Sequence, residues 1–415
     1  MSRRGRPGEF DAHLLSFVTL GLVAFGLVMV YSATSSSAAI ESGDPSYYLK
    51  RQAAYALLGL GLMIGISKLD FRTLRPLAPA LVLTSLGLLL AVLALGVPVN
   101  GAKRWLTVGP ATFQPSELAK FALCVWAAAY LTRSRPPRTL AELGRPLGVL
   151  LGLFSALILV EPDLGTAIAI VVMLAGMLLV GGVPGRVVAA GVTLAGAIGL
   201  AAIWLEPYRR ARIFSFLDPW HDAQGAGFQT VQAMIGLGSG GIFGVGLGQG
   251  VQKIFYLPEA HTDMIAAIIG EELGLVGTAA VIGAFAAFAY AGFGVAIRCR
   301  DPFGKRLAAG LTILICAQAA INLAAVMGLA PLTGIPLPFV SYGGSSLVVA
   351  LASVGILLNI AVDRAGEGRA QLPDRRGRNR GPRAAVARGR RSAQSARRAG
   401  DVRRVAGSRR SAARS

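Results

Sequence analysis

The chain has 415 residues, of which 54% are hydrophobic and only 15% charged, well below the roughly 25% of charged residues in average soluble domains. This composition excludes an ordinary soluble globular protein and predicts an all-α polytopic membrane protein. The net charge of +20 does not indicate nucleic-acid binding, because the tail, residues 364–415, carries 17 arginines against three acids and so accounts for +14 of it.

Apolar runs of about 20 residues, enough to cross a bilayer, recur throughout residues 14–363. We expect ten membrane helices, beginning near Leu14, Arg51, Leu77, Pro115, Arg145, Leu164, Val187, Asp263, Leu307 and Gly344. Residues 1–13 precede the first span, which lacks a clear cleavage site and is therefore expected to be retained. Basic residues concentrate in alternate connections, which predicts that both termini lie in the cytoplasm.

Two connections on the expected outer side are unusual. The first covers residues 98–114. The second, residues 206–262, is a long loop between the seventh and eighth helices, with ten glycines between Gly225 and Gly250. Its apolar stretch, residues 233–247, is too glycine-rich for an ordinary membrane helix, so we expect a re-entrant or interfacial segment that lines a cavity. The tail after residue 363 is expected to be disordered and to lie against anionic membrane lipids.

Charged residues inside the expected helices are the first candidates for function. Lys120 lies in the fourth helix, three residues after Glu117, so both side chains share one helix face. The pair either neutralises itself to let a polar helix insert or lines a cavity, and we favour the cavity because buried charges in membranes are more often functional. Glu161, Pro162 and Asp163 divide a long apolar run into two helices.

Asp263 opens the eighth expected helix and has two alternative roles. It is either a helix-capping acid that complements the helix dipole or an acid that faces an outer cavity. The helix continues to about Gly294, longer than a crossing requires, so its first turns are expected to stand in such a cavity together with Glu271. The acids and the histidine near Asp263 match no zinc signature, and no metal ligands are predicted.

Six basic residues on the expected outer side are candidates for binding an anionic substrate: Lys103, Arg104, Arg209, Arg210, Arg212 and Lys253. Each alone is best explained as a solvated charge, but together they suit a lipid-linked pyrophosphate. The glycine-rich residues 236–241 fit a dinucleotide fingerprint only formally, because no strand precedes them, and no Walker A motif occurs. No organic cofactor is therefore expected.

Four stretches, taken together, resemble one family. They are residues 101–120, from Gly-Ala-Lys-Arg-Trp to Ser-Glu-Leu-Ala-Lys; residues 161–167, Glu-Pro-Asp-Leu-Gly-Thr-Ala; residues 257–274, which contain Leu-Pro-Glu-Ala-His-Thr-Asp; and residues 337–346, Leu-Pro-Phe-Val-Ser-Tyr-Gly-Gly-Ser-Ser. The chain resembles the SEDS family (shape, elongation, division and sporulation) from its first span to about residue 363.

The resemblance implies a peptidoglycan glycosyltransferase that polymerises lipid II on the outer face of the bacterial cytoplasmic membrane. Asp263 matches the essential acid of the family, and we interpret it as a general base. The expected substrate-binding residues are Trp105, Glu117, Lys120, Glu161, Lys253, Glu259, Thr262, Ser341, Ser345 and Ser346. The resemblance also implies stimulation by a divalent cation (Mg²⁺ or Mn²⁺), a class B penicillin-binding protein as transpeptidase partner, and contacts with other divisome proteins.

Residues 216–220 and 256–263 resemble the division branch of the family. Thr333 stands where many division members have a lysine before Gly334, and this form also occurs in the elongation branch. A role in septal wall synthesis is therefore favoured over one in elongation. Two alternatives to a polymerase remain, a lipid II flippase and a scaffold that only recruits division enzymes.

Overall fold

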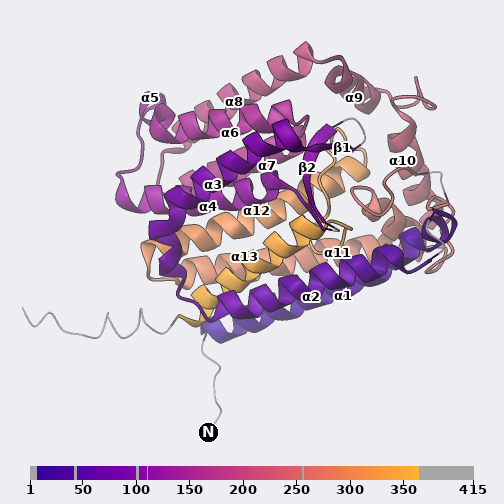
Figure 1. Ribbon diagram of the computed structural model, residues 1–415, viewed down its shortest axis with the longest axis horizontal. Helices are drawn as coiled ribbons and strands as arrows, with labels where there is room; N and C mark the ends of the chain where they lie inside the picture. The colour runs from indigo at the N-terminus through magenta and orange to yellow at the C-terminus, as the bar shows by residue number, and fades with distance from the viewer. Residues whose placement is uncertain (1–6, 42–43, 100–101, 110, 255–256, 364–415) are drawn as a thin grey trace, which may run out of the picture. The chain divides into compact units, whose positions relative to one another are not determined.

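The computed structural model describes residues 7–41, 44–99, 102–109, 111–254 and 257–363, and residues 1–362 form one compact unit. The expected disordered tail, residues 364–415, lies outside the described residues. The unit is built almost entirely of α-helices (Figure 1), which confirms the expected fold class.

The helices fall at the positions that the apolar runs indicate. Those of the first half are α1 (Pro7–Glu41), α2 (Tyr47–Ser67), the 3-10 turn η1 (Phe71–Thr73), α3 (Leu74–Leu95), α4 (Pro115–Arg133), α5 (Leu140–Leu143), η2 (Gly144–Gly148) and α6 (Val149–Val160). Those of the second half are α7 (Leu164–Val180), α8 (Gly185–Leu205), α9 (Pro207–Leu217), α10 (Phe228–Gly240), α11 (Ile265–Arg298), α12 (Pro302–Val326) and α13 (Gly344–Val362).

Each of the ten expected spans coincides with a helix. Within the described ranges, seven helical segments are long and apolar enough to cross a membrane, and α7 is a shorter apolar helix. The remaining two, α2 and α4, are helical where expected but carry more polar residues. The chain is thus a polytopic membrane protein, while the count of ten spans and the orientation stay predictions.

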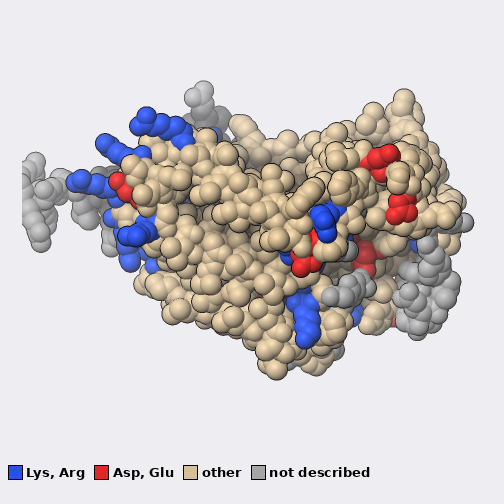
Figure 2. All heavy atoms as spheres, turned by 90° about the horizontal axis from the view of Figure 1, so that it is seen from above, with Lys and Arg blue, Asp and Glu red and all other residues tan. Residues whose placement is uncertain are grey.

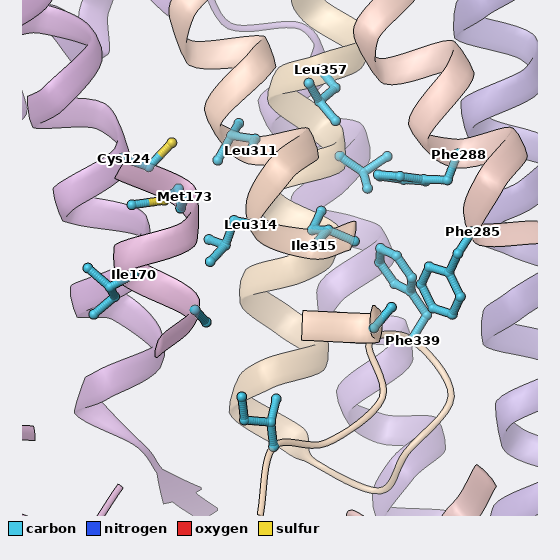
Figure 3. Close-up of a cluster of buried hydrophobic side chains, with 14 of the residues drawn as sticks. Cys124, Ile170, Met173, Phe285, Phe288, Leu311, Leu314, Ile315, Phe339 and Leu357 are labelled. Carbon is cyan, nitrogen blue, oxygen red and sulfur yellow. The ribbon is translucent and has the colours of Figure 1, made fainter. Parts of the chain in front are cut away.

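The core lies around α12, which contacts α4, α7, α11 and α13. Figure 3 shows part of it, with Leu311, Leu314 and Ile315 of α12 between the sulfur-bearing side chains of Cys124 and Met173 and a group of phenylalanines. Charged side chains are sparse between the ends of the unit: in Figure 2 lysine and arginine gather at one end and most acids toward the other. This distribution suits a surface in contact with lipid.

The first unusual connection is not a loop. It forms a three-stranded antiparallel sheet of β1 (Val97–Val99), β2 (Ala102–Val108) and β3 (Ala111–Phe113), a minor addition to the helical fold. Trp105 of β2 pairs with Val97. The backbone N–H and C=O groups of this connection need hydrogen-bond partners, and pairing of neighbouring strands supplies them. The strands are short because the connection itself is short.

The long outer loop also contains helices. The amphipathic α9 follows α8, and α10 covers the first half of the expected interfacial stretch. The 13 residues of α10 span about 20 Å, too short to cross a bilayer, and the helix packs against α11 and α12. Figure 1 shows the strands, α9 and α10 toward the same end of the unit.

The expected over-long eighth helix is broken. Within α11, Gly274 adopts φ 66° and ψ −159°, a conformation available to glycine because it lacks a Cβ. The residues after α10 repair the break: the amides of Leu275 and Val276 donate to the carbonyls of Gly241 and Ile242. The part after the break, residues 275–298, is about 36 Å long and is sufficient alone to cross a membrane.

Candidate active site

Asp263 lies in the turn immediately before α11. The N-cap position belongs to Met264, so Asp263 precedes the cap by one residue. Its side chain is half-buried, and its backbone carbonyl accepts a 2.7 Å hydrogen bond from the side-chain amide of Asn322. The carboxylate is therefore held at the head of the helix by the surrounding fold.

The surroundings of Asp263 favour a proton acceptor that works near neutral pH. The Thr262 hydroxyl donates to Glu259 Oε2 (2.9 Å) and lies 3.2 Å from Asp263 Oδ1, so it bridges two acids. Burial, and to a lesser extent the neighbouring Glu259 carboxylate, raise the pKa of Asp263 to about 6. The Arg212 guanidinium acts in the opposite direction. A carboxyl group with such a pKa is suited to general base catalysis.

Gly334 marks the space beside Asp263. A methyl group placed on this glycine would lie 3.8 Å from Asp263 Oδ2 and 4.0 Å from Arg104 Nη1, so the acid and the guanidinium converge there. Arg104 is oriented by its other nitrogens: Nε donates to the carbonyl of Glu161 (2.7 Å) and Nη2 to that of Pro162. A second guanidinium is held two residues before Gly334, where Arg212 Nη1 donates to the carbonyl of Leu332 (3.0 Å).

Glu161 follows α6 and is only 1% exposed. Neither of its carboxylate oxygens has a hydrogen-bond partner among the described residues. Burial and the neighbouring Asp163 raise the pKa of Glu161 to about 8, and Arg104 acts in the opposite direction. Asp163 itself caps α7 by accepting bonds from Thr166. The expected break between α6 and α7 is confirmed.

Glu117 and Lys120 form the expected pair on α4. Lys120 Nζ lies 2.8 Å from Glu117 Oε1, and both side chains are at least 95% buried. The helix that carries the pair, α4, contacts α3, α7 and α12. It does not show either residue next to Asp263, and their expected role in substrate binding stays a prediction.

Lys253 lies apart from the Asp263 carboxylate. Its ammonium group is 2.6 Å from Glu272 Oε1, and the Ser32 hydroxyl of α1 donates to the same carboxylate. Glu271, expected in the cavity, instead accepts bonds from the amides of Val251 and Gln252. Lys253 thus pairs with Glu272 of α11, and Glu271 binds the backbone of the loop. The expected role of Lys253 in substrate binding stays a prediction.

The three expected serines lie in or after the outer turn before α13, residues 331–343. Ser341 Oγ accepts from the amide of Leu337 (2.8 Å), and Ser345 Oγ accepts from the amide of Gln114 and donates to the carbonyl of Thr112. The Ser341 hydroxyl closes the turn, and the Ser345 hydroxyl joins the start of α13 to Thr112 and Gln114. Ser346 and Trp105 are half-buried, and their expected substrate contacts stay predictions.

The side chains that the structure adds to the site are Arg104, Arg212 and Asn322. Both arginines belong to the outer cations of the sequence, but no pattern there distinguishes them from Lys103 or Arg210. Asn322 gives a clearer signal, since a polar amide within an apolar helix must find a partner. The described residues contain no cluster of three or more His, Cys, Asp or Glu side chains that could hold a metal ion.

Known proteins resemble the chain over nearly its whole described length. The family model for "Cell cycle protein", FTSW_RODA_SPOVE, matches residues 12–366. A probable peptidoglycan glycosyltransferase FtsW of Geobacter sulfurreducens is 42% identical over 356 residues, which cover 85% of this chain and 95% of that protein.

Two solved structures also resemble the chain. One is a chain of a peptidoglycan synthase complex, studied for its coordination of polymerization and crosslinking, with 31% identity and a TM-score of 0.71; the match covers 86% of this chain and 98% of that one. The other is the rod shape determining protein RodA of Thermus thermophilus, with 29% identity, a TM-score of 0.62, and coverage of 84% and 96%.

Proposed function

The chain belongs to the FtsW/RodA/SpoVE family of cell cycle proteins and is integral to the cytoplasmic membrane, and we propose that it polymerises lipid II into peptidoglycan with Asp263 as general base. The observation that carries the proposal is the convergence of Asp263 and Arg104 at Gly334. A septal role is favoured because the FtsW relative is 42% identical, whereas RodA is 29% identical.

The proposed reaction needs one base at the acceptor. Asp263 takes the proton of an acceptor sugar hydroxyl, whose oxygen then attacks the anomeric carbon of the donor. A new C–O bond forms as the bond from that carbon to the lipid pyrophosphate breaks, and the pyrophosphate leaves with the electron pair. Because that leaving group is already a stable anion, it needs no second carboxylic acid of the kind that glycosidases use.

Arg104 and Arg212 are suited to the negative charge of the pyrophosphate. Both guanidinium groups are anchored by backbone carbonyls, so little side-chain freedom is lost when an anion binds. A preorganised cation near the leaving oxygen stabilises the charge that develops as the bond breaks. We propose that these two arginines provide this stabilisation.

The expected divalent cation has an incomplete set of protein ligands. Thr262 brings the carboxylates of Glu259 and Asp263 together, and the described residues contain no group of three or more His, Cys, Asp or Glu side chains that could hold a metal ion. Mg²⁺ commonly binds through few protein carboxylates together with substrate phosphates. We propose that a Mg²⁺ or Mn²⁺ ion arrives with the pyrophosphate and neutralises part of its charge, without a closed site in the protein. Chelation should then lower polymerisation without lowering the melting temperature of the protein.

We further propose a class B penicillin-binding protein as transpeptidase partner, and contacts with other divisome proteins. The support is the similar chain found in a peptidoglycan synthase complex. Lipid II is the proposed substrate because the relatives are peptidoglycan glycosyltransferases.

The test is polymerisation of lipid II by the purified protein with its transpeptidase partner. Asp263→Asn keeps the size of the side chain but removes the base, so glycan synthesis should fall at least 1,000-fold, about 4 kcal/mol in the barrier. Asp222→Asn is the matched control, since Asp222 is an exposed acid of the same outer loop.

Normal polymerisation by Asp263→Asn would disprove the assignment of the base. Movement of lipid II between leaflets without glycan synthesis would favour the flippase. A scaffold predicts that charge-neutral changes at Glu117, Lys120 and Asp263 leave division intact while deletion is lethal.

A further inference from the structure

One side-chain amide connects the catalytic segment to the outer turn. Asn322 of α12 is 2% exposed, and its Nδ2 donates to the carbonyl of Asp263 (2.7 Å) and to that of Ile335 (2.8 Å). Asp263 carries the proposed base, and Ile335 follows Gly334, the residue at which Asp263 and Arg104 converge. A single nitrogen therefore fixes the separation between the two backbones that border the reaction space.

The outer turn is a rigid reference for this contact. Phe339 is 2% exposed and packs against Phe288 of α11 with ring centroids 5.8 Å apart, as Figure 3 shows. Gln52 of α2, also buried, donates from Nε2 to the carbonyl of Ser341 (3.0 Å). Aromatic packing and hydrogen bonds to α2 thus hold the turn before Asn322 attaches Asp263 to it.

A second contact joins the same two segments. The amide of Tyr342 donates to the carbonyl of His261 at 2.9 Å. The turn therefore meets the catalytic segment at both His261 and Asp263. Two points of attachment restrict sliding and rotation of the segment, whereas one would leave it free to pivot.

The chemistry of Asn322 indicates why an amide stands here. A carboxylate would repel both carbonyl oxygens, and an apolar side chain would leave both without a donor at a cost of about 1–3 kcal/mol each. Asn322 Oδ1 is itself buried and has no hydrogen-bond partner among the described residues. Asn322 therefore occupies this position although its side-chain oxygen lacks a hydrogen-bond partner among those residues. This indicates that the position requires the two N–H donors of the amide.

We propose that Asn322 is a positioning residue for the polymerase reaction, which sets the placement of the Asp263 carboxylate relative to Gly334 and Arg104. The inference rests on the proposed function of Asp263. Asn322 does not contact the reacting atoms. Because a misplacement of about 1 Å can lower a rate 100-fold, a small displacement of this amide is sufficient to impair catalysis.

The alternative is an ordinary structural cross-link, and the chain offers a matched control for it. Asn359 of α13 also makes two hydrogen bonds with backbone groups: Oδ1 accepts from the amide of Phe71 (3.0 Å) and Nδ2 donates to the carbonyl of Ser67 (2.9 Å). Ser67 ends α2, so this cross-link lies about 22 Å along that helix from Gln52.

The experiment compares Asn322→Leu, Asn322→Gln and Asn359→Leu in the full chain with its transpeptidase partner, by melting temperature and by kcat and KM for lipid II. Both leucine variants should melt at lower temperature, but only Asn322→Leu should lose at least tenfold in kcat, with KM changed less than twofold. Asn322→Gln retains the donors and displaces them by one methylene, so it should regain stability without regaining kcat.

Two results would overturn the inference: equal loss of kcat in the two leucine variants, or recovery of kcat together with melting temperature in Asn322→Gln. Asp263→Asn is measured alongside. If that variant is inactive while either result is found, only the positioning role of Asn322 fails. If Asp263→Asn is active, the proposed base is wrong, and the inference that depends on it falls as well.

Discussion

The two ends of residues 251–264 place their charged side chains in opposite kinds of environment. At one end Lys253, Glu272 and Ser32 form a closed group with a 2.6 Å ion pair, and the two charged side chains are at most 4% exposed. At the other end Asp263 is half-buried beside a second acid, Glu259, with Thr262 between them. Only ten residues separate Lys253 from Asp263.

This contrast distinguishes a structural ion pair from a carboxyl group that can exchange its proton. Removal of either partner from a buried ion pair is strongly destabilising, because the other charge is then left uncompensated in a poorly polar environment. A carboxyl group beside a like charge binds its proton more tightly and exchanges it near neutral pH. The Lys253 end is therefore suited to fixing the segment, and the Asp263 end to accepting a proton.

The largest expected effect comes from breaking the Lys253 end. Lys253→Met leaves Glu272 buried without its cation and should lower the free energy of unfolding by about 3–5 kcal/mol. Thermal unfolding in detergent measures the loss. Lys50→Met, which breaks an exposed pair with Asp44, should lower the stability far less, because solvent screens that pair.

The double variant Lys253→Met/Glu272→Leu sharpens that test. Replacing both charges by apolar groups of similar size should restore most of the stability, since neither charge is then stranded. A double variant as unstable as Lys253→Met would show that the loss comes from packing rather than from the ion pair.

A methyl group at Gly334 perturbs the Asp263 end. Gly334→Ala places its Cβ 3.8 Å from Asp263 Oδ2 and 4.0 Å from Arg104 Nη1, and its φ of 71° adds about 1–2 kcal/mol of backbone strain. Polymerisation should fall roughly tenfold, because the methyl group occupies space beside both side chains. Gly328→Ala is matched in strain, also at φ 71°, but its Cβ meets the flexible end of Met234. A similar loss of rate in that control would assign the effect to strain alone.

A smaller effect is expected from removing the like charge. Glu259→Gln takes away a negative charge that raises the pKa of Asp263, so this pKa should fall from about 6 toward its ordinary value of 3.8. The base is active when deprotonated, so wild-type polymerisation declines as the pH drops through about 6. In the variant the decline should occur at lower pH, by up to about one unit. An unchanged pH profile would remove Glu259 from the electrostatics of the site.

The smallest effect is a gain in stability on removing the base. The pKa of Asp263 is higher in the folded protein than its ordinary value, so the folded state binds the proton more tightly. Asp263 therefore contributes stability below about pH 4 that is lost as the pH rises through about 6. Asp263→Asn, neutral throughout, should melt about 2 °C or more above the wild type at pH 8, and the difference should vanish at pH 4. A higher melting temperature at both values would point to packing instead.

The sequence locates the helices and the break between α6 and α7, but not the backbone that pairs with other segments. Apolar runs locate the helices because lipid demands a continuous apolar surface over a known length. The sheet around Trp105 and the break at Gly274 depend on pairing with neighbouring backbone, which no run of letters displays. Glycines in residues 241–250 indicate irregular backbone, but not that it would complete the hydrogen bonds of α11.

The sequence indicates contacts between residues that are close along the chain and misses contacts between distant segments. Asp263 is found through its motif, and Glu117 and Lys120 are found as a pair because three residues on a helix bring them together. The ion pair of Lys253 is missed because its partners, Glu272 and Ser32, come from other elements. Asn322 is missed for the same reason, since both of its acceptors lie outside α12.

The break at Gly274 has a consequence for where the polymer forms. Since residues 275–298 are long enough to cross the bilayer, we expect the nine residues of α11 before the break to project above the outer leaflet as a segment about 14 Å long. Asp263 stands on top of it. We expect the sugars to be joined at that height, above the headgroups, while the lipid carrier of the growing strand remains embedded in the bilayer below.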